Sequence, residues 1–219
     1  LKAGHIDTDT LKAGHIDTVA RTGEADGYLI SADRNPNTNG VKIILGLEDP
    51  GSQIEAIKLG IEQGRIKGLI ALQENLVDDA GFSTELLGKL DFLLSSYPLA
   101  NATADASDVV LPGACWAEKS GTMINATGRL QRLNKVVDAP GQTLESWEII
   151  RDLVQATGGG NGIYAVTDLF KQLAAEVPEF SGLTWGQIGD LGLPLLETGI
   201  TIPLLEREKQ RIASGLIVG

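Results

Sequence analysis

Gly68-Leu-Ile-Ala-Leu72 is the first of three short apolar runs that decide the fold, and Phe92-Leu-Leu94 and Val109-Val-Leu111 follow it. Apolar runs of this length are typical of strands that are buried on both faces of a sheet. Ser83, between the first two runs, is suited to cap a helix over residues 84–90. Because strands that alternate with helices require right-handed crossovers, the stretch predicts an α/β fold with a parallel sheet.

The same rhythm extends toward the N-terminus. Ser52 is expected to cap a helix that ends near Gly64, with Ile54, Ile57 and Ile61 on its apolar face. Further apolar runs at residues 28–30 and 41–45 lie on either side of the turn-rich residues 35–40. We therefore expect the α/β domain to begin near residue 27.

After Gly141 the apolar spacing becomes helical. Two amphipathic helices are predicted, one around Trp147–Val154 and one around Val166–Val177, with a flexible glycine-rich break at residues 158–162. Residues 183–219 show no clear period, and we expect them to pack against something outside this chain. The predicted organisation is thus a duplicated segment at 1–26, an α/β domain at 27–145 that contains an irregular loop at 111–131, and a helical connector and tail at 146–219.

The N-terminal segment repeats eight residues, Leu1–Thr8, as Leu11–Thr18. Two copies are too short to stack into a repeat fold, so we interpret them as a recent local duplication or a sequence artefact. Both histidines of the chain, His5 and His15, lie in these copies beside Asp7 and Asp17. Four ligands so widely spaced are a poor metal site, and we predict none.

Composition narrows the function classes. The chain has 219 residues and a net charge of −11, which disfavours nucleic acid and anionic membrane surfaces as partners. No apolar run approaches the roughly 20 residues that span a bilayer, so direct membrane insertion is not expected. A single cysteine, Cys115, excludes an internal disulfide and any cluster held by several cysteines of these residues. We expect a cytoplasmic protein.

Polar residues follow each predicted strand, at Gln73–Leu76, Ser95–Pro98 and Pro112–Cys115. Ligands of parallel α/β sheets bind at the carboxyl ends of the strands, so this rim is the expected ligand site. The polar loop 111–131 begins at the end of the third predicted strand, and so at the same rim.

Within that loop each residue has a structural and a functional interpretation. We favour Cys115 as a packed small apolar residue over a redox ligand, and Trp116 as a core or interface anchor. Glu118 and Lys119 are expected to form a hydrogen-bonded pair rather than an acid and base. Arg129 either holds a phosphate or carboxylate or ties the loop to the domain.

One long segment, Ala104-Asp-Ala-Ser-Asp-Val-Val-Leu-Pro-Gly-Ala-Cys-Trp-Ala-Glu-Lys-Ser-Gly-Thr-Met-Ile-Asn-Ala-Thr-Gly-Arg-Leu-Gln131, resembles the molybdopterin oxidoreductase family. Residues Ile66–Leu76 are similar to a family strand that leads into a Glu-Asn-Pro turn. Residues 146–150 and 168–178 resemble later helices of the family. The resemblance covers roughly residues 27–192. The resemblance implies a Rossmann-like sheet. It also implies a molybdopterin guanine dinucleotide or iron-sulfur clusters, carried by segments outside this chain, and no cofactor that this chain itself binds firmly.

Within the family, Gly128-Arg-Leu-Gln131 is most similar to the large iron-sulfur subunit of NADH-quinone oxidoreductase, the respiratory complex I. The chain has Leu76 where the molybdenum enzymes usually have proline, and Ser95-Ser96 where they often have an aspartate. A missing proline loosens the turn, and a missing carboxylate removes a partner for a guanine edge. The resemblance thus implies a scaffold for electron transfer with no chemistry of its own.

Two alternatives remain open. One is a fragment of a molybdopterin-dependent enzyme such as a formate dehydrogenase, which would bind part of the dinucleotide. The other is a stand-alone Rossmann-like binding module, although no Gly-x-Gly-x-x-Gly or Walker-type loop is present. The candidate cofactor-binding residues are Glu74, Asn75, Ser96 and Arg129, and no catalytic or metal-ligating residue is predicted. Expected partners are other segments or subunits of a respiratory oxidoreductase complex, which could hold the chain at the inner face of the cell membrane.

Overall fold

The computed structural model describes residues 15–160, 162–200 and 203–215. Its first sheet consists of β1 (Gly68–Leu72), β2 (Phe92–Tyr97) and β3 (Val109–Pro112), in the order β1-β2-β3. All pairings are parallel, with Ile70, Leu94 and Val109 in register. The three predicted strands and their parallel arrangement are confirmed. β2 continues beyond the apolar run because the backbones of Ser95 and Ser96 pair with β3 whatever their side chains are.

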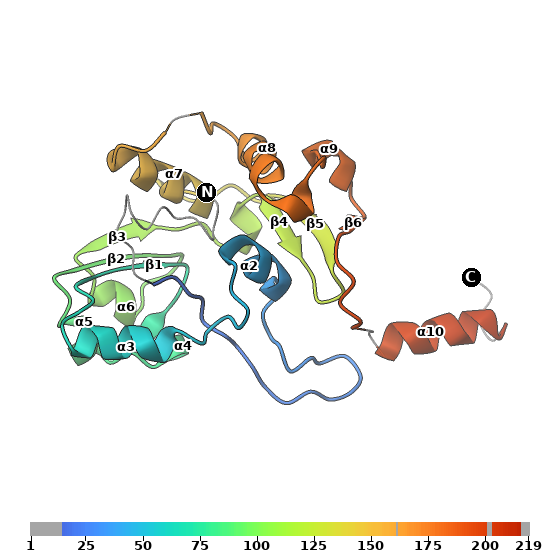
Figure 1. Cartoon of the computed structure of the whole chain (residues 1–219), viewed down its shortest axis with the longest axis horizontal. Coiled ribbons are helices and arrows are strands. Elements are labelled where there is room, and N and C mark those ends of the chain that lie inside the picture. Colours follow the sequence, from blue (N-terminus) through green and yellow to red (C-terminus); the bar gives the residue numbers. More distant parts are fainter. Residues whose placement is uncertain (1–14, 161, 201–202, 216–219) are drawn as a thin grey trace.

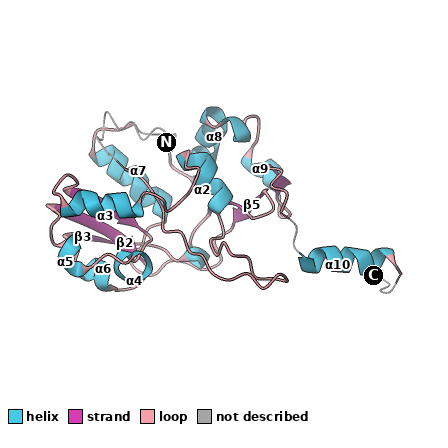
Figure 2. Ribbon diagram, turned by 60° about the horizontal axis from the view of Figure 1, so that its bottom comes forward, coloured by secondary structure: helices cyan, strands magenta, loops and turns pink. Residues whose placement is uncertain are grey.

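Four short helices accompany this sheet: α3 (Ile54–Glu62), α4 (Leu76–Ala80), α5 (Thr84–Leu87) and α6 (Ala102–Asp105). Figure 2 shows these helices around β2 and β3, and α3 contacts α5. Apolar residues of the helices and of β1 and β2 form the first core, which contains Ile57, Ile61, Ala71, Leu76, Phe82, Leu87 and Leu93. The predicted α/β class is therefore confirmed.

The helix caps follow the sequence only in part. Ser83 Oγ accepts a hydrogen bond from Leu86 N, so the predicted cap of α5 is confirmed. The expected cap of α3 at Ser52 is wrong, because the helix begins at Ile54 after Gln53. The carboxylate of Asp17 accepts from the backbone N–H groups of Gly51 and Gln53, each at 2.7 Å. A distant acidic side chain thus takes the place of the local serine.

A second sheet occupies most of the loop that the sequence indicates as irregular. It contains β4 (Gly121–Ile124), β5 (Arg129–Leu133) and β6 (Leu193–Pro194), all antiparallel. The expectation of irregular structure over 111–131 is wrong, because Asn125 Oδ1 closes the β4–β5 turn by accepting from the N–H groups of Thr127 and Arg129 at 3.1 and 2.9 Å. Turn chemistry prevails here over a weak apolar pattern.

The remaining helices are α2 (Thr38–Leu45), α7 (Ser146–Ala156), α8 (Val166–Glu176), α9 (Trp185–Ile188) and α10 (Pro203–Ala213), with short 3-10 turns η1 (Trp116–Glu118) and η2 (Pro178–Phe180). The two predicted amphipathic helices are confirmed as α7 and α8. α8 and α9 lie beside β4 and β5, whereas α10 stands apart from the rest of the fold (Figure 1).

A second core joins β4, β5, α8, η2 and α9. Its buried residues are Ile124, Leu130, Phe170, Val177, Phe180 and Ile188. Phe170 packs edge to face against Phe180 and Trp185, with ring centroids 6.0 and 5.8 Å apart. Ile43 and Ile44 of α2 pack against this core, so a helix early in the chain covers strands that lie much later.

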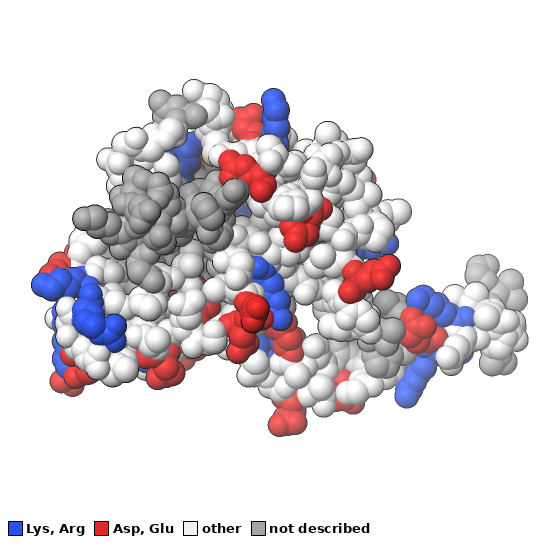
Figure 3. Space-filling view, in the orientation of Figure 1, with Lys and Arg blue, Asp and Glu red and all other residues white. Residues whose placement is uncertain are grey.

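Within the described ranges, no helix is long and apolar enough to cross a membrane. Figure 3 shows acidic and basic side chains interspersed over one face rather than gathered in a single patch.

Candidate functional site

The carboxyl ends of the three parallel strands meet at a small buried polar cluster. Gln73 follows β1, Ser96 lies near the end of β2, and Gly113 follows β3. Ser96 is 1% exposed, and neither its Oγ nor Gln73 Nε2 has a hydrogen-bond partner among the described residues. Buried polar groups without partners are rare and costly, so these two atoms mark a place where an additional polar group is needed.

Gly113 provides the space for this cluster. A Cβ at this position would overlap Gln73 Nε2 and lie 2.5 Å from Ser96 Oγ. Gln73 is the one non-glycine residue with a positive φ, 60°, in the described chain. The positive φ of Gln73 strains the backbone, and such strain often occurs at ligand sites. The three residues together form what we call the rim cluster.

The two serines at the end of β2 face opposite sides of the sheet. Ser95 Oγ lies 2.9 Å from Ser107 Oγ, in the turn that joins α6 to β3, and is therefore satisfied within the protein. Only Ser96 belongs to the rim cluster, because successive side chains of a strand alternate between its faces.

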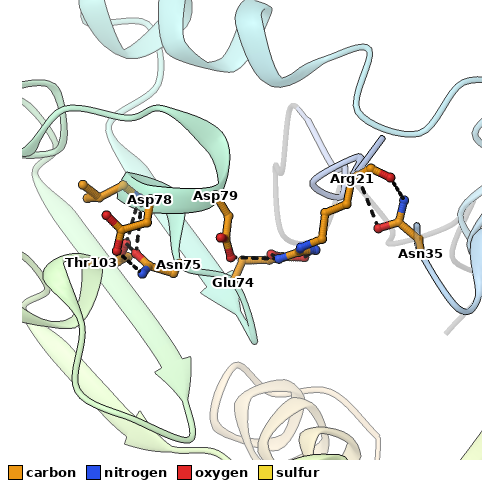
Figure 4. A network of polar contacts seen from close by, with 8 residues as sticks. Arg21, Asn35, Glu74, Asn75, Asp78, Asp79 and Thr103 are labelled. Carbon is orange, nitrogen blue, oxygen red and sulfur yellow. Dashed lines mark hydrogen bonds and ion pairs between the residues drawn. The ribbon is translucent and has the colours of Figure 1, made fainter. Parts of the chain in front are cut away.

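Glu74 is paired with a residue of the N-terminal segment. Arg21 Nη2 lies 2.6 Å from Glu74 Oε2 and 2.9 Å from Asp79 Oδ2 (Figure 4). The hydrogen bond to Glu74 is the largest of the effects that raise the pKa of Arg21 above its ordinary value. The carboxylate of Glu74 is thus paired with Arg21, which it shares with Asp79, and this contact connects the chain near residue 21 to the turn between β1 and α4.

Asn75 fixes the turn that follows β1. Its Oδ1 accepts from Thr103 Oγ1 at 3.1 Å, and its Nδ2 donates to Asp78 Oδ2 at 2.6 Å (Figure 4). It is also the N-cap of α4, with its side chain accepting from Asp78 N. The turn is therefore not loosened by the absence of proline at Leu76, because Asn75 is 9% exposed and hydrogen-bonded on both sides.

Arg129 lies apart from the other three candidate residues, in β5 of the second sheet. Its Nη1 donates to the carbonyl oxygens of Leu191 and Gly192, at 3.1 and 2.9 Å. This contact ties the chain before β6 to the hairpin. The structure thus brings Glu74, Asn75 and Ser96 to one rim and places Arg129 elsewhere.

The residues of the loop that begins at Leu111 take separate roles. Glu118 Oε2 accepts from Cys115 N at 2.9 Å, so Glu118 holds the η1 turn. The expected pairing of Glu118 with Lys119 is wrong, since Glu118 is bonded to the backbone of Cys115 and the carboxylate that acts on Lys119 is that of Glu145. Trp116 is 70% exposed, so it is not a core anchor, and its role as an interface residue stays a prediction.

Lys119 is half-buried. Loss of solvation lowers the pKa of its ammonium group, and the nearby Cys115 and Glu145 only partly oppose that effect. Glu145 itself accepts hydrogen bonds from Ser120 N at 2.7 Å and from Trp147 Nε1 at 3.0 Å.

The histidine segment lies only partly within the described residues. His5 and Asp7 fall outside them, and Asp17 is engaged with the start of α3. His15 Nδ1 lies 3.3 Å from Gln53 Oε1. Among the described residues, no group of three or more histidine, cysteine, aspartate or glutamate side chains could hold a metal ion.

Sequence reasoning locates the rim but misses some of its members. Gln73 and Gly113 lie in the segments that the sequence places at strand ends, and the glycine directly after a strand is the available signal for a close approach. Arg21 gives no signal, because nothing in its local sequence points to Glu74, more than 50 residues away.

Comparison with known proteins identifies the family of the chain. The model of the molybdopterin oxidoreductase family matches residues 3–156. The chain is 34% identical over 153 residues to the F420-dependent formate dehydrogenase 2 subunit alpha of Methanococcus maripaludis, covering 68% of this chain and 22% of that protein. It is 33% identical over 173 residues to the F420-dependent formate dehydrogenase subunit alpha of Methanocaldococcus jannaschii, covering 74% of this chain and 24% of the relative.

A third relative, the NADPH-Fe(3+) oxidoreductase subunit alpha of Geobacter sulfurreducens, is 33% identical over 145 residues, covering 63% of this chain and 17% of the relative. Among solved structures, acetylene hydratase from Pelobacter acetylenicus has the same fold, with a TM-score of 0.51 at 17% identity over 68% of this chain and 22% of that chain. The chain spans less than a quarter of the length of each of these proteins.

Proposed function

Because this chain belongs to the molybdopterin oxidoreductase family, we propose that it is the part of a formate dehydrogenase-like subunit that holds the nucleotide end of a molybdopterin guanine dinucleotide. The formate dehydrogenase α subunits among its relatives favour this function over the complex I scaffold that the Gly-Arg-Leu-Gln ending suggests. Partner subunits and the segments that bear the metal ligand belong to the remainder of the larger protein.

The rim cluster carries this proposal. Gln73 Nε2 and Ser96 Oγ are buried hydrogen-bond donors without partners among the described residues, and they lie at the sheet edge where such folds bind ligands. An oxygen acceptor of a nucleotide would satisfy both. The two donors without partners in the described chain therefore fit a polar group of the cofactor, and the lack of a side chain at Gly113 lets both donors lie at this edge.

The chemistry divides between the cofactor and the chain. When bound, the cofactor supplies the molybdenum or tungsten centre at which an oxidation takes place. The residues of this chain bind and orient the nucleotide through the donors of Gln73 and Ser96. Arg21 lies between Glu74 and Asp79, so it offsets part of the negative charge of these two carboxylates.

A second function, a scaffold like the large iron-sulfur subunit of complex I, is favoured by one observation. The charged and amide groups at the β1 end, Glu74 and Asn75, are fully occupied by Arg21, Asp78 and Thr103. A rim whose strongest polar groups are used internally suits a domain that has lost its ligand. In that case the rim cluster would hold only water.

Cofactor content decides between these functions. The parent protein that contains this chain would be purified with its native neighbours, and guanine nucleotide released by acid would be measured together with molybdenum and tungsten. We expect about one nucleotide per chain. Gly113→Ala should lower the nucleotide content severalfold because its Cβ intrudes on the cluster, and Ser96→Ala should lower it less, by about the strength of one hydrogen bond.

Gly121→Ala is the matched control, since an added Cβ at this position meets no atom within 4 Å. Wild-type protein that contains neither pterin nor metal would overturn the cofactor-binding function and support the scaffold.

A further inference from the structure

A cavity of about 330 Å³ lies away from the rim cluster, between β4 and the helices α7, α8 and α9. Its walls are mainly apolar, with Met123 and Leu133 from the second sheet and Ile150, Leu169 and Trp185 from the helices. A volume of this size lined by apolar and aromatic side chains with a few polar groups is typical of small-molecule sites.

Five residues with polar side chains also line the cavity, and two of them, Lys119 and Ser146, lack a partner for their polar group among the described residues: the others are Asn37, Ser120 and Thr122. Lys119 lines the cavity, is half-buried, and has no ion pair with a carboxylate among the described residues. Ser146 also lines it, and its buried Oγ has no hydrogen-bond partner in the described chain. A buried hydroxyl and a partly desolvated ammonium are both costly unless they meet an acceptor.

The start of α7 is already capped by the carboxylates of Glu145 and Glu148. Ser146 is the first residue of this 11-residue helix, whose N-terminal end carries a partial positive charge. Glu145 accepts hydrogen bonds from Ser120 N and Trp147 Nε1, and it makes no ion pair with Lys119 although its charge partly offsets the lowering of the pKa of Lys119 by burial. Lys119 is therefore the cation that remains available to a ligand.

We propose that this cavity binds a small carboxylic acid with a hydrophobic tail. Lys119 and Ser146 bind the carboxylate, and the tail packs among Leu169, Phe170 and Trp185. This binding site is separate from the rim cluster and does not depend on whether the rim holds a nucleotide.

Tryptophan fluorescence of the full 219-residue chain provides the test, because Trp147 and Trp185 line the cavity, whereas the third tryptophan, Trp116, is 70% exposed. The probe is 3-phenylpropionate, with 3-phenylpropanamide as its uncharged counterpart. We expect saturable quenching by the acid and an affinity for the amide that is lower by about tenfold or more, as for loss of a charge-assisted hydrogen bond.

Two variants locate the carboxylate. Lys119→Gln should weaken binding of the acid about tenfold while leaving the amide nearly unchanged, and Ser146→Ala should weaken the acid by about threefold to tenfold. Lys171→Gln is the matched control, because Lys171 is an exposed lysine of α8 outside the cavity lining. Circular dichroism of each variant shows whether the fold is kept.

Three results would overturn the proposal: no saturable quenching by the acid, equal affinities for acid and amide, or an unchanged acid affinity in a folded Lys119→Gln variant. If Lys119→Gln fails to fold, Ser146→Ala and the comparison of acid with amide still decide the outcome.

Discussion

At the scale of single residues, Asn75 joins two elements through one side chain. Its amide accepts from Thr103, which is 0% exposed, and donates to Asp78 in the first turn of α4. Thr103 Oγ1 in turn accepts from Val77 N at 3.2 Å. The turn after β1 is therefore fixed to α6 by a short chain of hydrogen bonds.

Replacing Asn75 by alanine should lower the free energy of unfolding by about 1–3 kcal/mol, since it removes a helix cap and leaves a buried hydroxyl without its acceptor. Urea denaturation would measure the change. Asn134→Ala, at an exposed asparagine, is the control and should change stability little. A loss at position 75 no larger than in this control would contradict the proposed network.

Lys119 should make the stability of the protein depend on pH. Its folded-state pKa is lowered by desolvation, so the unfolded chain holds the proton more tightly than the folded chain does. Stability contributed by this group is lowest below the folded pKa and rises with pH until the ordinary value of 10.5 is passed.

Lys119→Met should therefore raise the midpoint of thermal unfolding at pH 7, and its advantage over the wild type should shrink as the pH approaches about 10, near the ordinary pKa of lysine. Lys171→Met, which removes an exposed charge, should show no such convergence. A constant difference between wild type and Lys119→Met over this pH range would argue against a desolvated ammonium.

At the scale of elements, the β4–β5 turn binds the backbone of the residues that follow β6. Gly128 has a φ of 80°, and its carbonyl oxygen accepts from Leu195 N and Leu196 N at 2.9 and 3.0 Å. A Cβ on Gly128 would overlap the backbone carbonyl of Leu196. The conformation and the close approach both require glycine.

A glycine series separates these two requirements. Gly141 has a φ of 61° with open space around it, so Gly141→Ala should cost about 1–2 kcal/mol from backbone strain alone. Gly128→Ala should cost clearly more, because Leu196 must also move. Gly121→Ala, with neither constraint, is the control, and denaturation curves of the three variants would give the order. Equal costs at Gly128 and Gly141 would mean that the contact with Leu196 is unimportant.

The contact of Arg21 with Glu74 and Asp79 fastens the N-terminal segment to the β1–α4 turn. The side chain of Arg21 is 41% exposed, so solvent screening reduces the value of the network. A double-mutant cycle with Arg21→Met and Glu74→Gln should give a coupling free energy of up to about 1 kcal/mol that falls as salt is added. Lys67→Met with Asp91→Asn, an ion pair whose two side chains are each 69% exposed, is the comparison and should couple more weakly. Absence of coupling between Arg21 and Glu74 at low salt would contradict the proposed attachment.

At the scale of the whole molecule, the fold has two hydrophobic cores, and the second combines segments that lie far apart in the sequence. The second core unites Ile43 and Ile44 of α2, Ile124 and Leu130 of the hairpin, and Phe170 of α8. The boundary predicted at residue 145 therefore separates elements that pack together.

Truncation should reveal this dependence. A chain that ends after residue 145 loses the helices that cover Ile124 and Leu130, so it should bind the dye ANS and aggregate. A chain that ends after residue 200 keeps every buried residue of the second core and should remain folded. Soluble, cooperatively unfolding protein from the shorter chain would show that 27–145 is an independent domain.

Much of the fold could be predicted from the sequence because the relevant signals are local. Apolar runs indicate β1, β2 and β3, and helical spacing indicates α7 and α8. The second sheet could not be predicted in the same way, since β6 contributes only Leu193 and Pro194 and its partner is more than 60 residues away. The alternation of strands and helices predicted where the candidate ligand site lies. Which residues belong to it depended on which buried side chains lack a hydrogen-bond partner in the described structure.

The sequence by itself determined the α/β class, the parallel sheet, the rim at which polar residues gather, and the resemblance to the molybdopterin oxidoreductases. These follow from apolar periodicity and from a motif, which are properties of neighbouring residues. Only the tertiary structure decided that Glu74 is paired with Arg21, that Arg129 belongs to another sheet, and that Gln73 and Ser96 meet around Gly113. Hydrogen bonding and desolvation depend on which groups approach in space, and local sequence does not contain that information.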